Sequence, residues 1–272
     1  MSPPFLLAQI TDTHLLAQPT AQLRGCNPWR SLTAVLQQVA RHNPDGLLLT
    51  GDLAERGEAA AYGHLVSAIA PLKLPTYWLP GNHDSLGTLR PILDSLPASQ
   101  GLKSVDLGAW QLILLNSVLP QATVGEGYLA SCQLQRLEAD LTRHPTKPTL
   151  IALHHHPVPV GIDWVDQMQL QNAGELLALL NRFANVRVVV FGHIHHGFHH
   201  RPPNGPDFYG CPSSCLQVAP PRPQPEQPGF RLLWLYADGT HQTAVRRVRA
   251  AGGDHRPPTP LSDPFPQPIH HG

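Results

Sequence analysis

The sequence of 272 residues has few cysteines, few charged residues and no long hydrophobic run. Its 4 cysteines are too few, in a chain of this length, to form a disulfide-stapled scaffold. The apolar run near the start, at 5–10, has no basic stretch before it and is too short for a signal peptide or a membrane span. We therefore expect a cytoplasmic protein without a membrane partner.

The chain also lacks an excess of charge of either sign, with 19 Lys and Arg against 19 Asp and Glu. A protein that binds nucleic acid usually carries a basic excess and aromatic side chains along one stripe, and neither is visible here. We expect no nucleic-acid partner, although a small anionic substrate could still bind at a local site. The length suits one α/β domain, and we expect a monomer or a homodimer.

Proline and histidine, in contrast, are abundant. The chain has 30 prolines, about 11% against a usual level of about 5%. It has 17 histidines, nearly as many as all Lys and Arg together. Because histidine is the commonest protein ligand for transition metals, this count suggests a metal site before any motif is considered.

Short apolar runs alternate with helical patterns along the first two thirds of the chain. Runs rich in Leu, Val and Ile are typical of strands buried on both faces. We predict such strands at 5–10, 46–50, 76–79, 111–115, 149–153 and 186–191. Apolar stripes predict helices at 31–42, 58–70, around 134–141 and at 172–183, the last with a capping-box start at Asn172. Alternating strands and helices indicate βαβ units in a layered α/β fold.

The last third of the chain has a different character. Strands are predicted at 208–210, 230–236 and 241–248, with a hairpin turn at 237–240. The segment 250–272 consists mostly of polar residues, Pro and Gly, and cannot bury enough apolar surface to offset the entropy of ordering. We therefore expect one catalytic domain at 1–249 and a disordered tail at 250–272.

Polar side chains that can bind metals follow five of the predicted strands. They are Asp12 and His14, then Asp52, then Asn82, His83 and Asp84, then His154, His155 and His156, and finally His193 and His195. In an open α/β sheet the ligand crevice lies beyond the carboxyl ends of the strands, so we expect these groups to converge. Asp, Asn and His without Cys favour Mn, Fe or Zn over a thiolate site.

The local spacing is consistent with a single site. Asp12 and His14 are two residues apart, as are His193 and His195, and in an extended chain each pair would point to the same side. A glycine precedes several of the candidate ligands, as in Gly81-Asn82 and Gly192-His193, and permits a sharp turn and a close backbone approach.

These five motifs in this order, D-x-H, GD, GNHD, H-H and GH-x-H, resemble the calcineurin-like metallophosphoesterases. Longer stretches, over roughly 5–248, are similar to the bacterial class III cyclic AMP phosphodiesterases. The stretches concerned are LAQITDTHLLA, WLPGNHD, LHHHPVPVGIDWVDQ, LQNAGELLALL and VVVFGHIHH. The resemblance implies a four-layer α/β/β/α sandwich with two divalent metal ions, Fe or Mn, with Zn as an alternative.

The resemblance also implies a role for each candidate residue. Asp12, His14 and His195 would bind one metal, Asn82, His154 and His193 would bind the other, and Asp52 would bridge them. His155 is the alternative ligand for the second metal in place of His154. His83 would be the catalytic histidine that faces the phosphate, together with substrate contacts from His14, Asp52, Asn82 and His195.

The expected reaction is hydrolysis of 3′,5′-cyclic AMP to 5′-AMP, by attack of a metal-bridging hydroxide with departure of the ribose 3′-oxygen. His83 would protonate that oxygen or neutralise charge on the phosphoryl group, and the sequence leaves both roles open. The alternative is a broader phosphodiesterase or phosphatase acting on glycerophosphodiesters, 2′,3′-cyclic nucleotides or nucleotide-sugar lipids. A scaffold without activity is disfavoured because all candidate ligands are present.

Several neighbouring residues have two possible roles. Asp84 could support His83 or cap the following helix, and Trp164 could stack on a nucleobase or pack against the core. Cys211 and Cys215 could indicate redox chemistry or a further metal, but small buried apolar residues are the favoured interpretation.

Overall fold

Two six-stranded sheets face each other in the computed structural model, which describes residues 3–218 and 227–249. The first sheet has the order β12 (His241–Arg247), β11 (Gly229–Leu235), β1 (Phe5–Ile10), β2 (Gly46–Thr50), β3 (Thr76–Leu79), β4 (Ser99–Gly101). The second has the order β5 (Ser104–Leu107), β6 (Trp110–Leu114), β7 (Thr149–Ala152), β8 (Val186–Phe191), β10 (Asp207–Gly210), β9 (Phe198–His200). In each sheet four neighbouring strands are parallel, and antiparallel strands lie at the edges.

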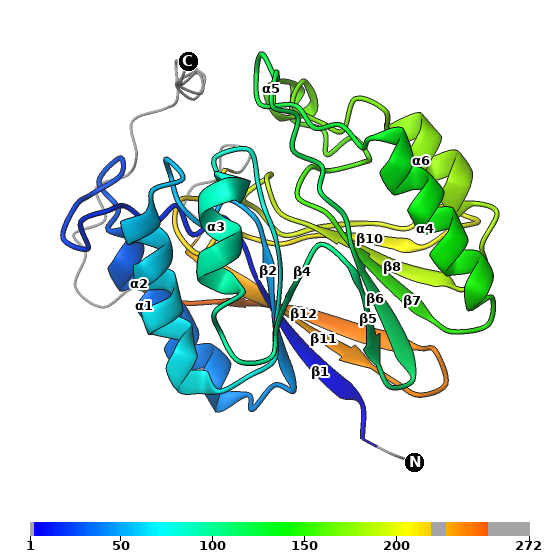
Figure 1. Ribbon diagram of the computed structural model, residues 1–272, viewed down its shortest axis with the longest axis horizontal. Helices are drawn as coiled ribbons and strands as arrows, with labels where there is room; N and C mark the ends of the chain where they lie inside the picture. Colours follow the sequence, from blue (N-terminus) through cyan, green and yellow to red (C-terminus); the bar gives the residue numbers. More distant parts are fainter. Residues whose placement is uncertain (1–2, 219–226, 250–272) are drawn as a thin grey trace.

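Helices cover the outer face of each sheet, so that the molecule has four layers (Figure 1). The helices are α1 (Pro28–Arg41), α2 (Ala59–Ile69), α3 (Leu86–Leu93), α4 (Ser131–Arg143), α5 (Asp163–Asp166) and α6 (Ala173–Leu180), with a 3₁₀ turn at Ala70–Leu72. Side chains of α1, α2 and α3 pack on the first sheet, and those of α4 and α6 pack on the second. The predicted α/β/β/α sandwich is confirmed. None of the helices in the described ranges is long and apolar enough to cross a bilayer.

Strand β2 shows how the sequence produces these layers. Successive side chains of a strand point to opposite faces. Leu47 and Leu49 therefore join the core beneath the helices, and Leu48 joins the core between the two sheets. Both faces are apolar and buried, which explains why the central strands appear in the sequence as continuous apolar runs.

The predicted strands at 5–10, 46–50, 76–79 and 186–191 have the same bounds in the structure, and the others agree to within a residue or two. Helix α1 begins three residues earlier than expected, because the Asn27 side chain accepts a hydrogen bond from the Arg30 N–H and Pro28 suits the first helical position. The hairpin turn at 237–240 joins β11 to β12 as predicted. The short elements β4, β5, β9 and α5 were not predicted, and α3 was expected only as a helix of unstated bounds after Asp84.

The prediction of a capping box at Asn172 was wrong. Asn172 stands at the cap position of α6 but makes no capping hydrogen bond there. Its side chain instead accepts from the Leu129 N–H and donates to the Leu129 carbonyl, at 3.0 and 2.9 Å, and so ties the start of α6 to the segment before α4. Local pattern alone does not reveal such a distant backbone partner. The predicted tail at 250–272 lies outside the described residues.

Candidate metal centre

The loops that follow five strands meet at the carboxyl ends of both sheets. Backbone hydrogen bonds join the loops of the first sheet, with the Asp12 N–H donating to the Gly51 carbonyl at 2.9 Å. The two sheets are joined by the His193 N–H, which donates to both carboxylate oxygens of Asp12 at 3.1 and 3.2 Å. Within the second sheet, the Gly192 N–H donates to the His154 carbonyl and joins the loops after β7 and β8. Residues 181 positions apart thus come into direct contact.

Two glycines permit this approach. A Cβ on Gly192 would lie 2.1 Å from Thr11 Oγ1, and one on Gly81 would lie 2.2 Å from Asp52 Oδ1. Both distances are far below van der Waals contact, so a larger residue at either position would separate the loops. The close backbone approach expected from the sequence is confirmed.

The candidate residues hold an unusual backbone conformation. Asp12, His14, Asp52, His193 and His195 all have φ between 45° and 67°, in the left-handed region that non-glycine residues rarely adopt. The expectation that each D-x-H or H-x-H pair is extended was therefore wrong, although the side chains do converge. Backbone strain of this kind is tolerated where surrounding structure enforces it and is common at functional sites.

A first cluster consists of Asp12, His14, Asp52 and His195, all buried, whose ligand atoms lie close enough together to hold a metal ion. The Nε2 atoms of His14 and His195 are 3.1 Å apart, and His195 Nε2 lies 3.2 Å from Asp12 Oδ1. His14 Nε2 lies 3.8 Å from Asp52 Oδ2. The nitrogen and oxygen atoms therefore converge on one point.

The other ring nitrogens of this cluster point away and are fixed by oxygen acceptors. His14 Nδ1 lies 2.7 Å from a carboxylate oxygen of Glu55, and His195 Nδ1 lies 2.9 Å from the Leu216 carbonyl oxygen. An acceptor at Nδ1 places the proton there and leaves Nε2 with a lone pair. The orientation expected of metal-binding imidazoles is thus present on both rings.

A second cluster lies on the other side of Asp52. His154 Nε2 is 3.1 Å from Asn82 Oδ1 and 3.4 Å from Asp52 Oδ2, while its Nδ1 is 2.7 Å from the Thr50 carbonyl oxygen. The ring of His193 lies beside that of His154, with centroids 5.1 Å apart. Asp52 therefore touches both clusters.

The Nε2 atom of His193 is buried and has no hydrogen-bond partner among the described residues. A buried polar atom without a partner is costly, and such cases in native proteins call for an explanation. A metal ion held by His193, His154 and Asn82 would satisfy this atom. The residues present therefore fit a metal at this position as well as at the first cluster.

The geometry distinguishes His154 from its neighbours in the triple-histidine segment. Both ring nitrogens of His155 are engaged elsewhere, Nδ1 with Ser117 Oγ at 2.8 Å and Nε2 with the Gly125 carbonyl at 3.1 Å. Both ring nitrogens of His156 are buried without a hydrogen-bond partner among the described residues, and its Nε2 lies 3.4 Å from Asp166. Of the three, His154 directs a nitrogen toward Asn82 and Asp52, which favours it over His155 as the ligand.

Burial and neighbouring charges set the protonation of these groups. Burial alone would raise the pKa of Asp52, but the imidazoles of His154 and His83 hold it well below its usual range. Burial lowers the pKa of His193 well below its usual value, and the nearby His155 adds to this effect. An ionised aspartate and a neutral histidine are the forms that bind a metal.

His83 lies at the edge of both clusters and remains partly open to solvent, with 19% of its side chain exposed. Its N–H donates to Asp52 Oδ1 at 2.9 Å, and its Nδ1 lies 3.0 Å from the Glu55 carbonyl. Burial would lower the pKa of His83, but the carboxylates of Asp52 and Glu55 raise it. The structure thus places beside the candidate metal ligands an imidazole whose surroundings favour its protonated form.

Two functional neighbours were missed or misread from the sequence. Glu55, three residues after Asp52, was not singled out, and only its spacing from the GD motif could have suggested it. Asp84 neither contacts His83 through its side chain nor caps α3, whose cap residue is Ser85. Its carboxylate accepts from the backbone N–H groups of Leu53, Ala54 and Gly81 and from Tyr62 Oη, and so ties the loops after β2 and β3 together.

The sequence model of the calcineurin-like phosphoesterase family matches residues 5–197, which contain every candidate ligand. The chain belongs to this family. Among its relatives is a 3′,5′-cyclic-nucleotide phosphodiesterase from Nostoc sp., 41% identical over 90% of this chain and 93% of the relative. Another is the 3′,5′-cyclic adenosine monophosphate phosphodiesterase CpdA of Escherichia coli K12, 41% identical over 89% of each chain. A dimetal phosphatase from Danio rerio shares the fold, with a TM-score of 0.68 at 16% identity over 91% of this chain and 100% of that one.

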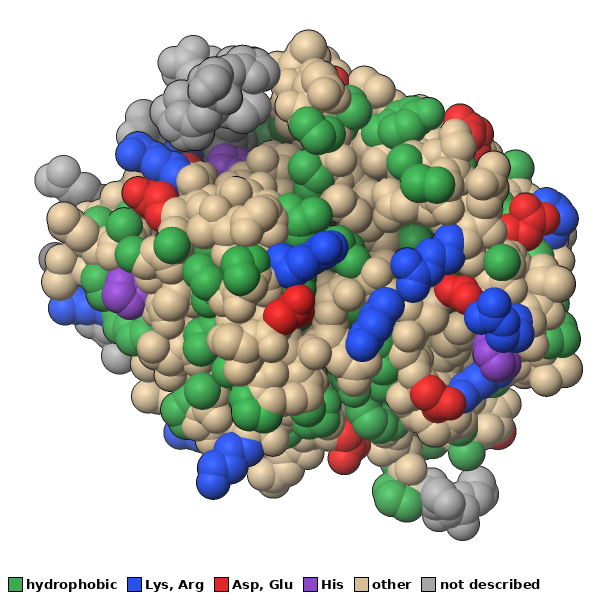
Figure 2. All heavy atoms as spheres, viewed as in Figure 1, with side chains coloured by type: hydrophobic (Ala, Val, Ile, Leu, Met, Phe, Trp, Pro, Cys, Tyr) green, Lys and Arg blue, Asp and Glu red, His purple; other side chains and the backbone are tan. Residues whose placement is uncertain are grey.

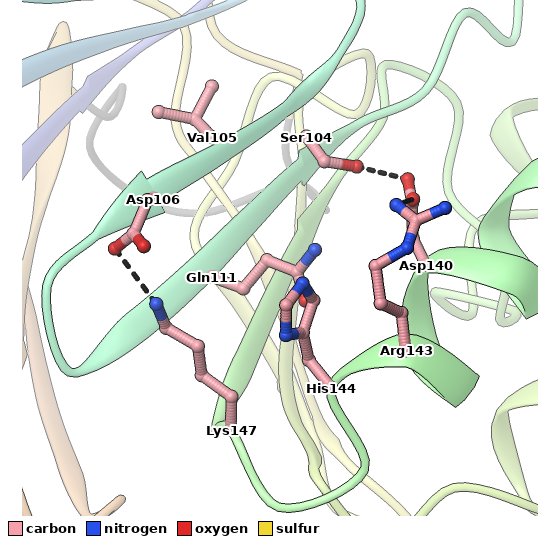
Figure 3. A pocket seen from close by; sticks show the side chains of 8 residues that line it. All are labelled: Ser104, Val105, Asp106, Gln111, Asp140, Arg143, His144 and Lys147. Carbon is pink, nitrogen blue, oxygen red and sulfur yellow. Dashed lines mark hydrogen bonds and ion pairs between the residues drawn. The ribbon is translucent and has the colours of Figure 1, made fainter.

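A cavity of about 220 Å³ in this phosphoesterase lies away from the two clusters, at the amino ends of β6 and β7 (Figure 3). Its basic side chains are paired with acidic ones. Lys147 Nζ lies 2.8 Å from Asp106, and Arg143 lies 3.1 Å from Asp140. Because these charges are already neutralised within the cavity, it offers no comparable site for a phosphate.

Proposed function

We propose that this phosphoesterase hydrolyses 3′,5′-cyclic AMP to 5′-AMP with two divalent metal ions. The observation that carries the proposal is the convergence of Asp12, His14, Asp52 and His195 in one buried cluster. Asp52 also lies 3.4 Å from His154 Nε2, beside His193, whose Nε2 is buried without a hydrogen-bond partner among the described residues. The named activities of the relatives from Nostoc and E. coli, each similar over about nine tenths of its length, supply the substrate.

In this proposal each cluster holds one ion. Asp12, His14 and His195 would hold the first ion, Asn82, His154 and His193 would hold the second, and Asp52 would be a ligand to both. Oxygen and imidazole donors suit Fe and Mn, with Zn as an alternative. The two ions would supply Lewis acidity toward the phosphoryl group and an ionised water as nucleophile at neutral pH.

The chain's own residues then hold the substrate and move a proton. His83, with its raised pKa and its partial exposure, donates a proton to the departing ribose 3′-oxygen or neutralises charge on the phosphoryl oxygens. His14, Asp52, Asn82 and His195 border the same space and contact the phosphate. Glu55 and the Leu216 carbonyl fix the rings of His14 and His195. Trp164 packs against the core of the second sheet, which is consistent with a structural role.

The remaining expectations form part of the same proposal. We assign catalysis to 1–249 and propose the cytoplasm as the compartment. Nucleic acid is not proposed as a partner, and on the face shown in Figure 2 basic and acidic side chains are interspersed. We propose a small-molecule substrate and a monomer or homodimer.

A substrate panel tests the proposal. The metal-loaded enzyme and the Asp52→Ala variant are assayed on 3′,5′-cyclic AMP, 3′,5′-cyclic GMP, 2′,3′-cyclic AMP and an aryl phosphodiester. We expect 5′-AMP from 3′,5′-cyclic AMP with the highest kcat/KM, and a loss of about 10³-fold or more in kcat/KM for the variant. Activity on the aryl diester or on 2′,3′-cyclic AMP with none on 3′,5′-cyclic AMP would favour the broader phosphodiesterase instead.

A further inference from the structure

Two cysteines from distant parts of the sequence lie in contact beside the candidate metal centre. Cys26 is in the loop between β1 and α1, and Cys215 is in the segment between β10 and β11, 189 positions away. Their Sγ atoms are 3.4 Å apart, with the thiol of Cys215 donating to Cys26. A disulfide requires an S–S distance of about 2.05 Å, so a small movement of one side chain would suffice to form it.

The two thiols differ in exposure and in chemistry. Cys26 is half-buried, whereas Cys215 is only 3% exposed. The hydrogen bond from Cys215 lowers the pKa of Cys26, and the same bond together with burial raises the pKa of Cys215. This pairing is typical of an attacking thiol within reach of solvent and a protected resolving thiol behind it.

The segment that holds Cys215 also supports the first cluster. Ser213 Oγ accepts from the Cys215 N–H at 2.8 Å and donates to the Asp12 carbonyl at 2.7 Å. The next residue after Cys215, Leu216, provides the carbonyl oxygen that fixes His195 Nδ1. A displacement of Cys215 toward Cys26 would therefore be transmitted to Asp12 and His195.

We propose that Cys26 and Cys215 form a reversible disulfide with a low-molecular-weight aliphatic disulfide as oxidant, and that the cross-link lowers phosphodiesterase activity by displacing the Leu216 carbonyl from His195. The formation of the disulfide is argued from the geometry of the two sulfur atoms. Its effect on phosphodiesterase activity rests on the proposed function. The proposed modification site joins the loop after β1 to the segment between β10 and β11, and neither cysteine is a candidate ligand.

The protein disulfide forms by thiol–disulfide exchange in two steps. The Cys26 thiolate attacks one sulfur of the small disulfide, whose S–S bond breaks and releases one thiolate, leaving a mixed disulfide on Cys26. The Cys215 sulfur, after losing its proton, attacks Cys26 Sγ and expels the second thiolate. The protons of the two cysteines end on the two released thiols. The protein thiols lose two electrons, and the small disulfide gains them.

Thiol counting with peptide mapping tests the formation of the disulfide. The purified chain is incubated with glutathione disulfide, then denatured, titrated for free thiols and digested. Because the exposed Cys132 can itself exchange with glutathione disulfide, thiols and mass are measured on Cys132→Ser. We expect two fewer free thiols, the loss of two hydrogen atoms by mass, and a peptide cross-linked through Cys26 and Cys215. Cys26→Ser must abolish the cross-link, and the matched control Cys132→Ser, at an exposed position on α4, must leave it unchanged.

A mixed disulfide that stays on Cys26, or modification of Cys132 alone, would overturn the proposal. The melting temperature gives a second readout that does not depend on catalysis. Closing so long a loop should raise it by about 5–10 °C, and dithiothreitol should reverse the rise. Cys26→Ser should show no such shift.

The effect on phosphodiesterase activity is tested on the same oxidised sample. Cyclic AMP hydrolysis and metal retention should each fall about tenfold in the oxidised enzyme and recover on reduction, because His195 has lost the acceptor that orients it. Cys26→Ser should keep its activity in both conditions. A cross-linked enzyme with unchanged activity would contradict the link to His195 and leave the disulfide itself standing. A failure of the proposed substrate would not affect the thiol count.

Discussion

The two ends of the parallel strands carry similar residue types in different surroundings. At the carboxyl ends, Asp12, His14, Asp52 and His195 are buried, adopt left-handed backbones and direct their ligand atoms at a shared point. At the amino ends, beside the cavity of Figure 3, Lys147 pairs with Asp106, whose side chain is 75% exposed. The density of charged groups therefore does not locate the functional site. The functional site is located instead by buried Asp and His side chains whose ligand atoms converge.

The two ends of the strands also differ in how much each ion pair contributes to the free energy of folding. An ion pair as exposed as Lys147–Asp106 is screened by water and contributes about 0–1 kcal/mol. The contact between His14 Nδ1 and Glu55, whose side chains are 1% and 12% exposed, is protected from that screening. Substitutions at the carboxyl end should therefore change activity strongly, and those at the amino end should not.

The largest effect is expected for Asp52→Ala. Asp52 lies next to His14 in one cluster and His154 in the other, so its loss removes the shared ligand and one of the two formal negative charges. We expect kcat/KM for cyclic AMP to fall by about 10³-fold or more, which corresponds to about 4 kcal/mol of transition-state stabilisation. Steady-state assays after metal loading measure this, with a melting curve as the folding control. Retention of full activity would show that the site lies elsewhere.

His83→Ala should reduce kcat by about 10²-fold without changing the metal content, because His83 borders the clusters but does not belong to them. A diester with a good leaving group separates its two possible roles. If His83 protonates the leaving oxygen, the defect should disappear with an aryl diester, whereas a charge-neutralising role would keep it. An unchanged kcat on both substrates would remove His83 from the mechanism.

Glu55→Ala should weaken metal retention about tenfold, since the acceptor that orients His14 is lost. The half-time of inactivation by a chelator, compared with that of the wild type, measures this. Glu58→Ala is the matched control, because Glu58 precedes α2 without a side-chain capping bond. Equal half-times for the two variants would contradict a positioning role for Glu55.

The smallest effect is expected at the opposite end of the strands. Lys147→Ala removes the ion pair with Asp106, whose side chain is largely exposed to solvent. We expect kcat/KM to stay within about twofold of the wild type and the free energy of unfolding to change by less than about 1 kcal/mol. A large loss of activity would mean that the cavity at the amino ends participates in function and would undermine the contrast between the two ends.

Much of the fold and the composition of the site could be predicted from the sequence. The central strands are buried on both faces, so each appears as an apolar run, and parallel strands must bring their carboxyl ends to one edge. Asp12, Asp52 and His154 could therefore be placed near one another from their positions along the chain. The extended geometry assumed for Asp12 and His14 was wrong, because the tertiary contacts of these loops impose the left-handed conformation.

Other features depend on contacts that no local pattern encodes. Asn172 looks like a capping residue, yet its side chain bonds to Leu129, 43 positions away. Cys215 is buried as expected, but its contact with Cys26 follows from the meeting of two loops and not from its spacing to Cys211. Glu55 gains its importance from the Nδ1 atom of His14, whose direction is fixed by the fold.

Metal stoichiometry combined with activity tests the central claim most directly. The wild-type chain is stripped with a chelator, reloaded with Mn or Fe, separated from free ions and analysed for metal, and each sample is assayed on cyclic AMP. The account predicts two ions per chain in the active form, no hydrolysis in the stripped form and recovery on reloading. Full hydrolysis of cyclic AMP by protein that retains no metal would contradict it.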